Sequence, residues 1–277
     1  MVRSADRALE ILEILGTIKG GLKHGEIAQA LNIPKSSLSK LISSLLAKDY
    51  LAIDSANRTY SIGPMVLTLA NSYLAGLDIV RAAQPVIWDA MVKTGESASL
   101  MIRSGHEGLI VCKENSSHIV IARFSIGMRV PLYASAGGKA MLAFIPPEEL
   151  DAYISSVELV QLTPATITNP DDLRKELKKI RNKGLARCNG EQFEDLISIA
   201  APVFGWNGRV VASVGTPFPK IRSNAESEGI IGDVLLEASR EISRKLGLGQ
   251  TPPFSGLRCS GRCSAFPREA FSRFHGR

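Results

Sequence analysis

The chain has 277 residues, of which 45% are hydrophobic and 22% charged, a composition typical of a globular protein with room for two domains. No apolar run is long enough to span a bilayer, and the polar start is unlike a secretory signal. Four cysteines do not make a disulfide framework in a chain of this size, so we expect a cytoplasmic protein without a membrane partner. Residues 247–277 contribute +4 of the net charge of +6, so nucleic-acid binding must be argued from local pattern.

The first part of the chain has apolar residues at helical spacing in three consecutive segments. These segments are 4–18, 26–32 and 34–46, and a tight turn at Asn32 separates the last two. Two strand-like runs, 50–54 and 58–62, follow on either side of a short turn. Three helices and a hairpin in this order predict a winged helix-turn-helix domain over residues 1–63.

The helix expected over residues 34–46 has a polar face without acidic residues. In a major groove its serines would contact base edges or phosphates, and its lysines would suit phosphates. An ordinary solvated helix face is the alternative, but the preceding helix, the tight turn and the hairpin favour DNA binding. The arginine at the hairpin tip is expected to touch the minor groove or a phosphate, with a plain surface arginine as the alternative. The predicted DNA-binding residues are Lys35, Ser36, Ser37, Ser39, Lys40 and Arg58.

Beyond the hairpin, the pattern predicts a linker helix at 64–80 and then a second domain at 81–248 that mixes strands with helices. Strand-like runs are expected at 99–102, 108–112, 118–124, 197–204 and 209–215. Helices are expected at 138–144, 147–155, 171–183 and 225–246. The segment 249–277 has no periodicity and is rich in Pro, Gly, Ser and Arg, which predicts a disordered basic tail.

These segments together resemble the isocitrate lyase regulator (IclR) family of bacterial transcription factors. In the first domain the resemblance rests on RALEILEIL, EIAQALNIPKSSLSKLISSL and YLAIDSANRTYSIGP, and in the second on residues 127–143, 184–204 and 208–213. It implies an α+β fold in which a winged helix-turn-helix is joined by a linker helix to a GAF-like antiparallel-sheet domain that binds a small effector. It also implies a homodimer or dimer of dimers that binds double-stranded operator DNA, and the family includes repressors and activators.

The resemblance places the effector at the loop 135–138, whose glycines would let an anion approach the start of a helix. A plain strand-to-helix turn is the alternative. Cys188 stands where an acidic residue is frequent in the family, and Gly215 and Pro217 stand where serines are usual. These changes favour a carboxylate-bearing effector with a less polar or bulkier body than a two-carbon keto acid. The effector-binding residues implied by the resemblance are Ile119, Ala122, Val130, Ala136, Gly137, Cys188, Ser198, Gly215 and Pro217.

No catalytic, cofactor or metal site is expected. Residues 133–140 depart from a phosphate-binding Walker A loop, and the four histidines are scattered. Cys259, Cys263 and His275 are too few ligands for a closed zinc site. We therefore expect a transcriptional repressor released from DNA by a small organic-acid-type metabolite. An activator of the same family is one alternative, and an enzyme or a protein-interaction module built on the GAF-like domain is an alternative of a different class.

Overall fold

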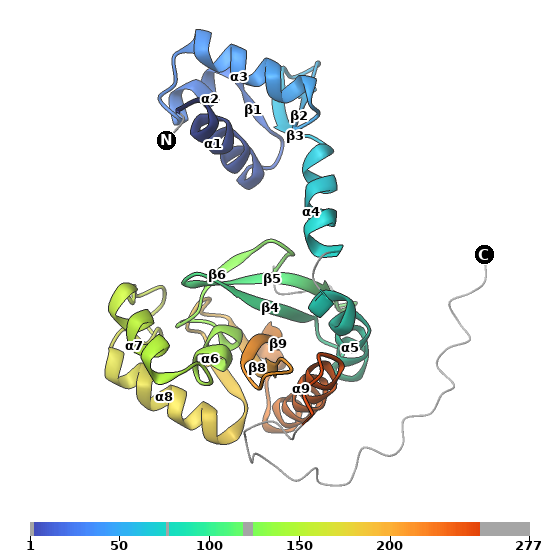
Figure 1. The fold of residues 1–277 in the computed structure, drawn as a ribbon, viewed down its shortest axis with the longest axis vertical. Coiled ribbons are helices and arrows are strands. Elements are labelled where there is room, and N and C mark those ends of the chain that lie inside the picture. Colours follow the sequence, from blue (N-terminus) through green and yellow to red (C-terminus); the bar gives the residue numbers. More distant parts are fainter. Residues whose placement is uncertain (1–2, 76–77, 119–123, 250–277) are drawn as a thin grey trace, which may run out of the picture. The chain divides into compact units, whose positions relative to one another are not determined.

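The computed structural model describes residues 3–75, 78–118 and 124–249 (Figure 1). Its helices and strands follow the spacing of apolar residues along the chain. The chain divides between residues 77 and 78 into two compact units, which are described separately here. The expected tail beyond residue 249 lies outside the described residues, and so does the middle of the strand expected at 118–124.

The N-terminal unit contains four helices and a small sheet among its described residues. These elements are α1 Arg3–Thr17, β1 Leu22–Lys23, α2 His24–Ala30, α3 Lys35–Ala47, β2 Leu51–Asp54, β3 Thr59–Ile62 and α4 Met65–Ala75. Strand β3 pairs antiparallel with both β1 and β2, so the sheet order is β1-β3-β2. The core of the unit is formed by Ile11, Leu15, Ile27, Ala28, Ile33, Leu38, Ile42 and Leu51. Three helices followed by a hairpin confirm the predicted winged helix-turn-helix.

Two residues with left-handed backbone conformation set the angles between these elements. Asn32 has φ +49° between α2 and α3, and Asp49 has φ +57° between α3 and β2. Asn and Asp adopt this conformation more readily than other residues that carry a side chain. Asn32 therefore allows a tight turn between α2 and α3, and Asp49 allows one between α3 and β2.

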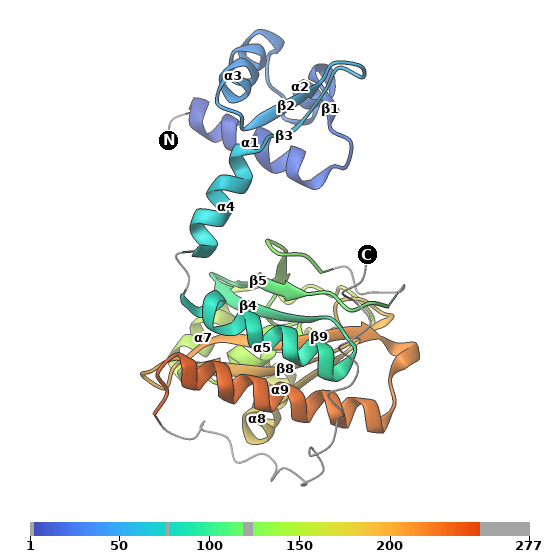
Figure 2. The ribbon, with the colours of Figure 1, turned by 90° about the vertical axis from the view of Figure 1, so that its right-hand side faces the viewer.

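The C-terminal unit contains a six-stranded antiparallel sheet of order β6-β5-β4-β9-β8-β7. Helices α5 and α9 pack on one face of the sheet and α6 packs on the other (Figures 1 and 2). Its elements are α5 Asp78–Thr94, β4 Ala98–Ser104, β5 Glu107–Glu114, β6 Arg129–Pro131, α6 Ala136–Leu142, α7 Pro147–Ser156, α8 Pro170–Lys183, β7 Ala186–Asn189, β8 Leu196–Phe204, β9 Val210–Pro219, the 3-10 helix η1 Lys220–Arg222 and α9 Ala225–Lys245.

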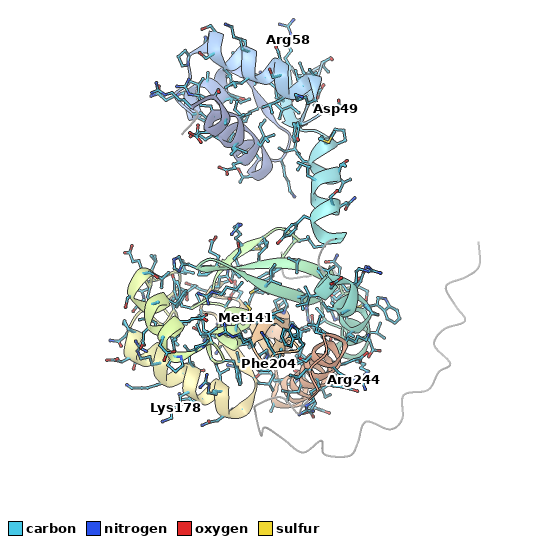
Figure 3. The ribbon with its side chains drawn as sticks, viewed as in Figure 1. Asp49, Arg58, Met141, Lys178, Phe204 and Arg244 are labelled. Atoms are coloured by element: carbon cyan, nitrogen blue, oxygen red, sulfur yellow. The ribbon has the colours of Figure 1, made fainter. Side chains whose placement is uncertain are left out.

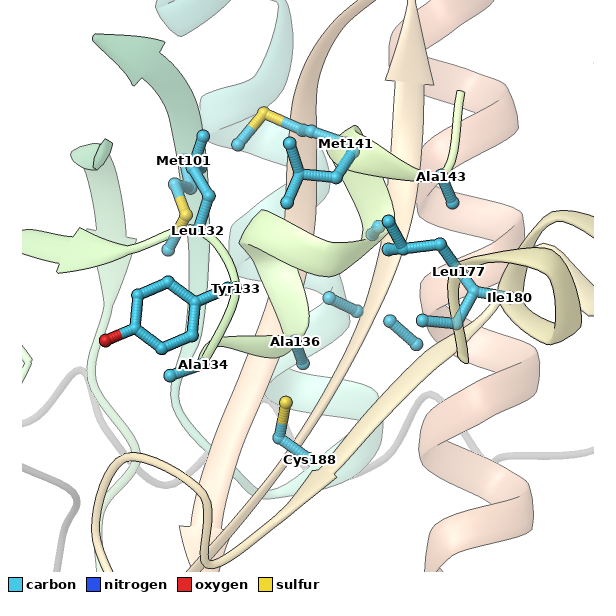
Figure 4. Packing of buried hydrophobic residues seen from close by; sticks show 14 of the residues in the cluster. Met101, Leu132, Tyr133, Ala134, Ala136, Met141, Ala143, Leu177, Ile180 and Cys188 are labelled. Carbon is cyan, nitrogen blue, oxygen red and sulfur yellow. The ribbon is translucent and has the colours of Figure 1, made fainter. Parts of the chain in front are cut away.

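Helix α6 is packed into the sheet unusually closely because its second and third residues are glycines. A Cβ atom added to Gly138 would collide with the backbone of Leu132, so only glycine fits there. On its other side α6 contacts α8, and Figure 4 shows Ala136 and Met141 of α6 in one buried cluster with Leu177 and Ile180.

The structure differs from the expected elements at the linker and in some short segments. The helix expected at 64–80 corresponds to α4 Met65–Ala75, and α5 begins at Asp78, before the expected start of the second domain at 81. Helix α6 begins at residue 136 rather than 138, because the Ser135 side chain caps it by accepting a hydrogen bond from Gly138 N at 3.2 Å. The strands β6 and β7 were not predicted as separate elements. Both lie at the edges of the sheet. Strand β6 has only three residues, whereas β7 does alternate between buried and exposed residues over its four positions.

Candidate functional site

Helix α3 exposes a polar stripe on the side opposite its buried residues. Leu38 and Ile42 face the core, while Ser36, Lys40 and Ser43 are exposed at positions i, i+4 and i+7 of one helical face. The sequence analysis did not include Ser43, although its spacing from Ser36 could have identified it. The remaining expected residues of this helix flank the stripe: Lys35 and Ser39 are exposed, and Ser37 is half-buried.

The hydroxyl group of Ser39 is held by two neighbours. Ser39 Oγ donates to the carbonyl oxygen of Lys35 at 2.9 Å, and His24 Nε2 lies 3.0 Å from the same Oγ. The hydroxyl group of Ser39 has a single proton, and it donates this proton to the carbonyl oxygen of Lys35. The contact with Ser39 Oγ is therefore a hydrogen bond that His24 Nε2 donates. His24 begins α2, so this bond joins the two helices of the helix-turn-helix. The sequence analysis treated His24 as one of four scattered histidines.

Arg58 lies at the tip of the β2–β3 hairpin, where it is exposed and has φ +53° (Figure 3). Asp54 braces this turn by accepting hydrogen bonds from Ala56 N at 2.9 Å and from Asn57 Nδ2 at 2.7 Å. The Asn57 side chain, together with the backbone amides, lowers the pKa of Asp54. The turn is therefore well braced and presents an arginine on the wing.

In the C-terminal unit, a cavity of about 40 Å³ lies between the sheet and the start of α6. Strand pairing explains which residues meet there: Ser198 is paired with Pro217, and Gly215 is paired with both Ala200 and Ser99. The cavity therefore brings together Ala136, Gly137, Ser198, Gly215 and Pro217, five of the expected effector residues. It is lined by Ser99, Met101, Ile110, Phe124, Ser135, Ala136, Gly137, Gln192, Ser198, Ile199, Ala200, Ser213, Gly215, Thr216 and Pro217.

Two of the expected effector residues that the structure describes, Val130 and Cys188, do not line this cavity. Val130 is fully buried in the core beside Leu132. Cys188, paired with Ser198 across the sheet, lines an adjoining cavity of about 10 Å³ that also contacts Ser198 and Pro217. Ile119 and Ala122 lie outside the described residues.

Ser213 is a lining residue that the sequence analysis missed. Its hydroxyl is buried and has no hydrogen-bond partner among the described residues. A Cβ atom on Gly137 would lie 2.8 Å from Ser213 Oγ, so this hydroxyl faces the start of α6. Ser213 shares a face with Gly215 and Pro217 through the two-residue period of the strand, so this strand offers a hydroxyl to the cavity. That period was the signal available in the sequence.

The described residues that line the cavity include no Lys, Arg, Asp or Glu. A buried ion pair lies beside the cavity instead, where Lys139 Nζ is 2.6 Å from Glu191 Oε1. Burial alone would lower the pKa of Lys139, but the Glu191 carboxylate beside it opposes burial, and the pKa is raised. Burial also raises the pKa of the Cys188 thiol to about 12, so Cys188 is neutral and the Glu191 carboxylate is the counter-charge.

A winged helix-turn-helix with an acid-free helix face, followed by an antiparallel-sheet domain with an internal cavity, defines a two-domain DNA-binding regulator. The family model for the bacterial transcriptional regulator IclR C-terminal domain matches residues 71–244, and the model for the IclR helix-turn-helix domain matches residues 4–55. The chain belongs to the IclR family of transcriptional regulators, as the sequence analysis predicted.

Relatives and solved structures agree with this assignment. The HTH-type transcriptional regulator BhcR of Paracoccus denitrificans is 31% identical and the alignment covers 87% of this chain and 86% of that protein. The HTH-type transcriptional repressor AllR of Escherichia coli is 29% identical, and the alignment covers 90% of this chain and 92% of that protein. The crystal structure of Thermotoga maritima IclR matches with a TM-score of 0.77 at 33% identity, covering 89% of this chain and 100% of that chain. These relatives carry the names of regulators rather than enzymes. None of the described helices is long and apolar enough to cross a membrane.

Proposed function

We propose that this regulator is a homo-oligomeric repressor that binds operator DNA through α3 and releases it when a small organic acid enters the cavity beside α6. The observation that supports the proposal is the buried, unpartnered hydroxyl of Ser213, which lies next to Gly137 in the lining of a cavity in the C-terminal unit. A buried polar group without a partner is costly unless something else satisfies it. A ligand oxygen would satisfy it.

The start of α6 supports an anionic ligand group. The first amides of a helix have no acceptor within the helix, and Ser135 takes only that of Gly138. Ala136 and Gly137 line the cavity, so a carboxylate bound there would lie close to the first amides of the helix. The neutral thiol at Cys188 adds no repulsion.

The size of the cavity supports a conformational response. A volume of about 40 Å³ holds only a few water molecules, since each requires roughly 10–15 Å³. A ligand with a bulkier body would bind only when the walls move apart, and it would therefore favour an opened state. Such differential binding is what an effector needs in order to change DNA affinity.

Two measurements test the proposal. Thermal melting of the full chain against a panel of organic acids identifies a ligand, because a molecule that binds only the folded state raises the melting temperature. Fluorescence anisotropy with a DNA fragment selected by the protein from a random pool then measures DNA affinity with and without that ligand. We expect DNA binding to fall steeply with salt, and the ligand to weaken it roughly 5–150-fold.

The outcomes separate the alternatives. A ligand that strengthens binding, or that changes transcription without releasing DNA, would establish an activator instead; AllR, named as a repressor, is a relative that supports the repressor assignment. Turnover of the ligand would indicate an enzyme. If the protein shows no salt-dependent DNA binding, the proposal is overturned, and a protein-interaction module becomes the favoured alternative.

A further inference from the structure

A second and larger cavity lies at the other end of α6, with a volume of about 240 Å³. It is bordered by Met141 near the end of α6 and by Phe144, which follows that helix. Three arginines from separate elements also line it: Arg103 on β4, Arg181 on α8 and Arg209 before β9. This arginine groove shares no lining residue with the cavity that contains Gly137.

The charges in the arginine groove are unbalanced. Glu149 is the one acidic residue among those that line it. It bridges two guanidinium groups loosely, at 3.4 Å from Arg103 Nη1 and 3.7 Å from Arg209 Nη1. Both distances exceed the roughly 2.7–2.9 Å of a strong charge-assisted hydrogen bond. Three cations against one anion leave an excess positive charge at the groove.

The third arginine differs from the other two in its surroundings. Arg181 Nε donates to the carbonyl oxygen of Ala143 at 2.6 Å, and Nη2 donates to that of Ile145 at 3.3 Å. Its guanidinium carbon also lies 5.8 Å from the centre of the Phe144 ring. Backbone carbonyls satisfy Arg181 without neutralising its charge, so it holds a fixed positive charge over an aromatic wall.

The rest of the groove is apolar, and Met141 at its base is buried. The volume exceeds the roughly 150 Å³ of an engineered protein cavity that holds benzene. A ligand that fits both features has a compact apolar body and one negatively charged head. Arg103 and Arg209 already hold one carboxylate, that of Glu149, between them, so a carboxylate head suits their spacing.

We propose that the arginine groove is a second small-molecule site of this protein, selective for a carboxylate on an aromatic or branched aliphatic body. The carboxylate replaces or joins Glu149 between Arg103 and Arg209, while the body lies on Met141 and Phe144. Because α6 borders this groove at Met141 and the other cavity at Gly137, a ligand here acts on the same helix. The site does not depend on the proposed effector function.

Isothermal titration calorimetry of the full chain with benzoate, and with neutral benzamide as the control ligand, tests this site. We expect benzoate to bind and benzamide to bind much more weakly. The double variant Arg103→Ala/Arg209→Ala should weaken benzoate binding about tenfold or more, because it removes both guanidinium groups that would hold the carboxylate. The matched control is Arg174→Ala, which removes an exposed arginine paired with Asp151 elsewhere in the same unit and should bind as wild type does.

Two further variants give readouts that a merely structural role would not produce. Glu149→Gln removes the competing carboxylate and should strengthen benzoate binding several-fold while leaving benzamide unchanged. Gly137→Val fills the other cavity and should leave this binding intact. Benzoate binding that is undetectable in wild type, unchanged in the double arginine variant, unchanged in Glu149→Gln or abolished by Gly137→Val would overturn the proposal. An equal loss in Arg174→Ala would also overturn it, by showing a general charge effect.

Discussion

Lys139 Nζ and Glu191 Oε1 lie 2.6 Å apart in the interior of the C-terminal unit, and this contact ties together two walls of the predicted effector cavity. Lys139 belongs to α6, while Glu191 precedes Gln192, which lines the cavity from the β7–β8 connection. The Thr166 hydroxyl donates to the Glu191 carbonyl oxygen at 2.6 Å and so holds this connection in place. Glu191 Oε2, in contrast, is buried without a partner among the described residues.

The buried pair should be sensitive to the loss of either partner. Glu191→Gln leaves an uncompensated ammonium in the interior, which we expect to lower the free energy of unfolding by about 3–5 kcal/mol. Lys139→Met leaves the carboxylate uncompensated and should cost a similar amount. The double variant Lys139→Met/Glu191→Gln removes both charges and should recover most of the loss. Urea denaturation of the four proteins measures this coupling, and purely additive losses would contradict it.

The two described cysteines should be unreactive in the folded protein. Burial raises the pKa of the Cys188 thiol to about 12 and that of Cys112 to about 11. Since the thiolate is the nucleophile, almost none is present at pH 8. We expect iodoacetamide to label both residues only after urea is added, as followed by mass spectrometry of the tryptic peptides. Labelling of Cys188 in the native protein at the rate of a free cysteine peptide would show that its surroundings are open.

Neighbouring glycines at the start of α6 should respond differently to an added methyl group. In Gly137→Ala the new Cβ lies 2.8 Å from Ser213 Oγ, inside the cavity. We expect this variant to fold and bind DNA but to lose most of its response to the effector, and Gly137→Val to lose all of it. In Gly138→Ala the Cβ collides with the Leu132 backbone, which cannot yield, so this variant should melt several degrees lower.

Melting curves with and without the ligand, followed by anisotropy with DNA, separate these two effects. Ser213→Ala is the companion variant, because it removes the hydroxyl proposed to bind the ligand without adding bulk to the cavity. It should reduce the melting shift that the ligand causes and leave DNA binding without ligand unchanged. A Gly137→Val protein that responds as wild type does would place the effector elsewhere.

Local pattern was sufficient for the fold because most helices carry their own apolar face and their own end signals. Helix α8 shows this clearly: Asn169 caps its start, Gly184 ends it with φ +72°, and Leu173 and Leu177 are buried at helical spacing. The family resemblance implied Gly215 and Pro217 as effector residues, and both line the cavity. Of the seven described residues that the family resemblance implied, five line that cavity.

The features that were missed depend on contacts between distant residues. In the sequence, Lys139 stands out only as part of an incomplete phosphate-binding loop. Its ion-pair partner Glu191 lies 52 positions away, so no local pattern relates the two residues. His24 and Ser39 are 15 positions apart on different helices, so no single-helix periodicity relates them. Ser213 is different, because its alternation with Gly215 was visible. The family resemblance points to positions 215 and 217 and does not point to Ser213.

The bond from His24 to Ser39 should affect DNA binding through the orientation of Ser39. His24→Ala removes the donor and should weaken specific DNA binding by about 0.5–1.5 kcal/mol, the usual contribution of one hydrogen bond. If His24 acts through Ser39, the double variant His24→Ala/Ser39→Ala should be no weaker than Ser39→Ala alone. Anisotropy with the selected DNA fragment measures all four proteins. Additive losses would show that His24 acts independently of Ser39.

The polar stripe on α3 should separate base recognition from phosphate binding. Ser36 and Ser43 lie on the exposed face with short hydroxyl side chains, which suit base edges in the major groove. We expect Ser36→Ala/Ser43→Ala to weaken binding to the selected DNA much more than binding to unrelated DNA. The slope of log K against log salt should stay unchanged, because no cation is lost.

The lysines on the same helix should behave in the opposite way. Lys35→Ala and Lys40→Ala should weaken both kinds of DNA to a similar degree, and each should reduce the salt slope by about one. Lys48→Ala, just beyond the end of α3, is the matched control for general charge, and its smaller effect would show that position on the helix matters. If neither the serine nor the lysine variants change affinity, α3 does not bind DNA. If the serine variant loses affinity for both DNAs equally, Ser36 and Ser43 contact phosphates rather than bases.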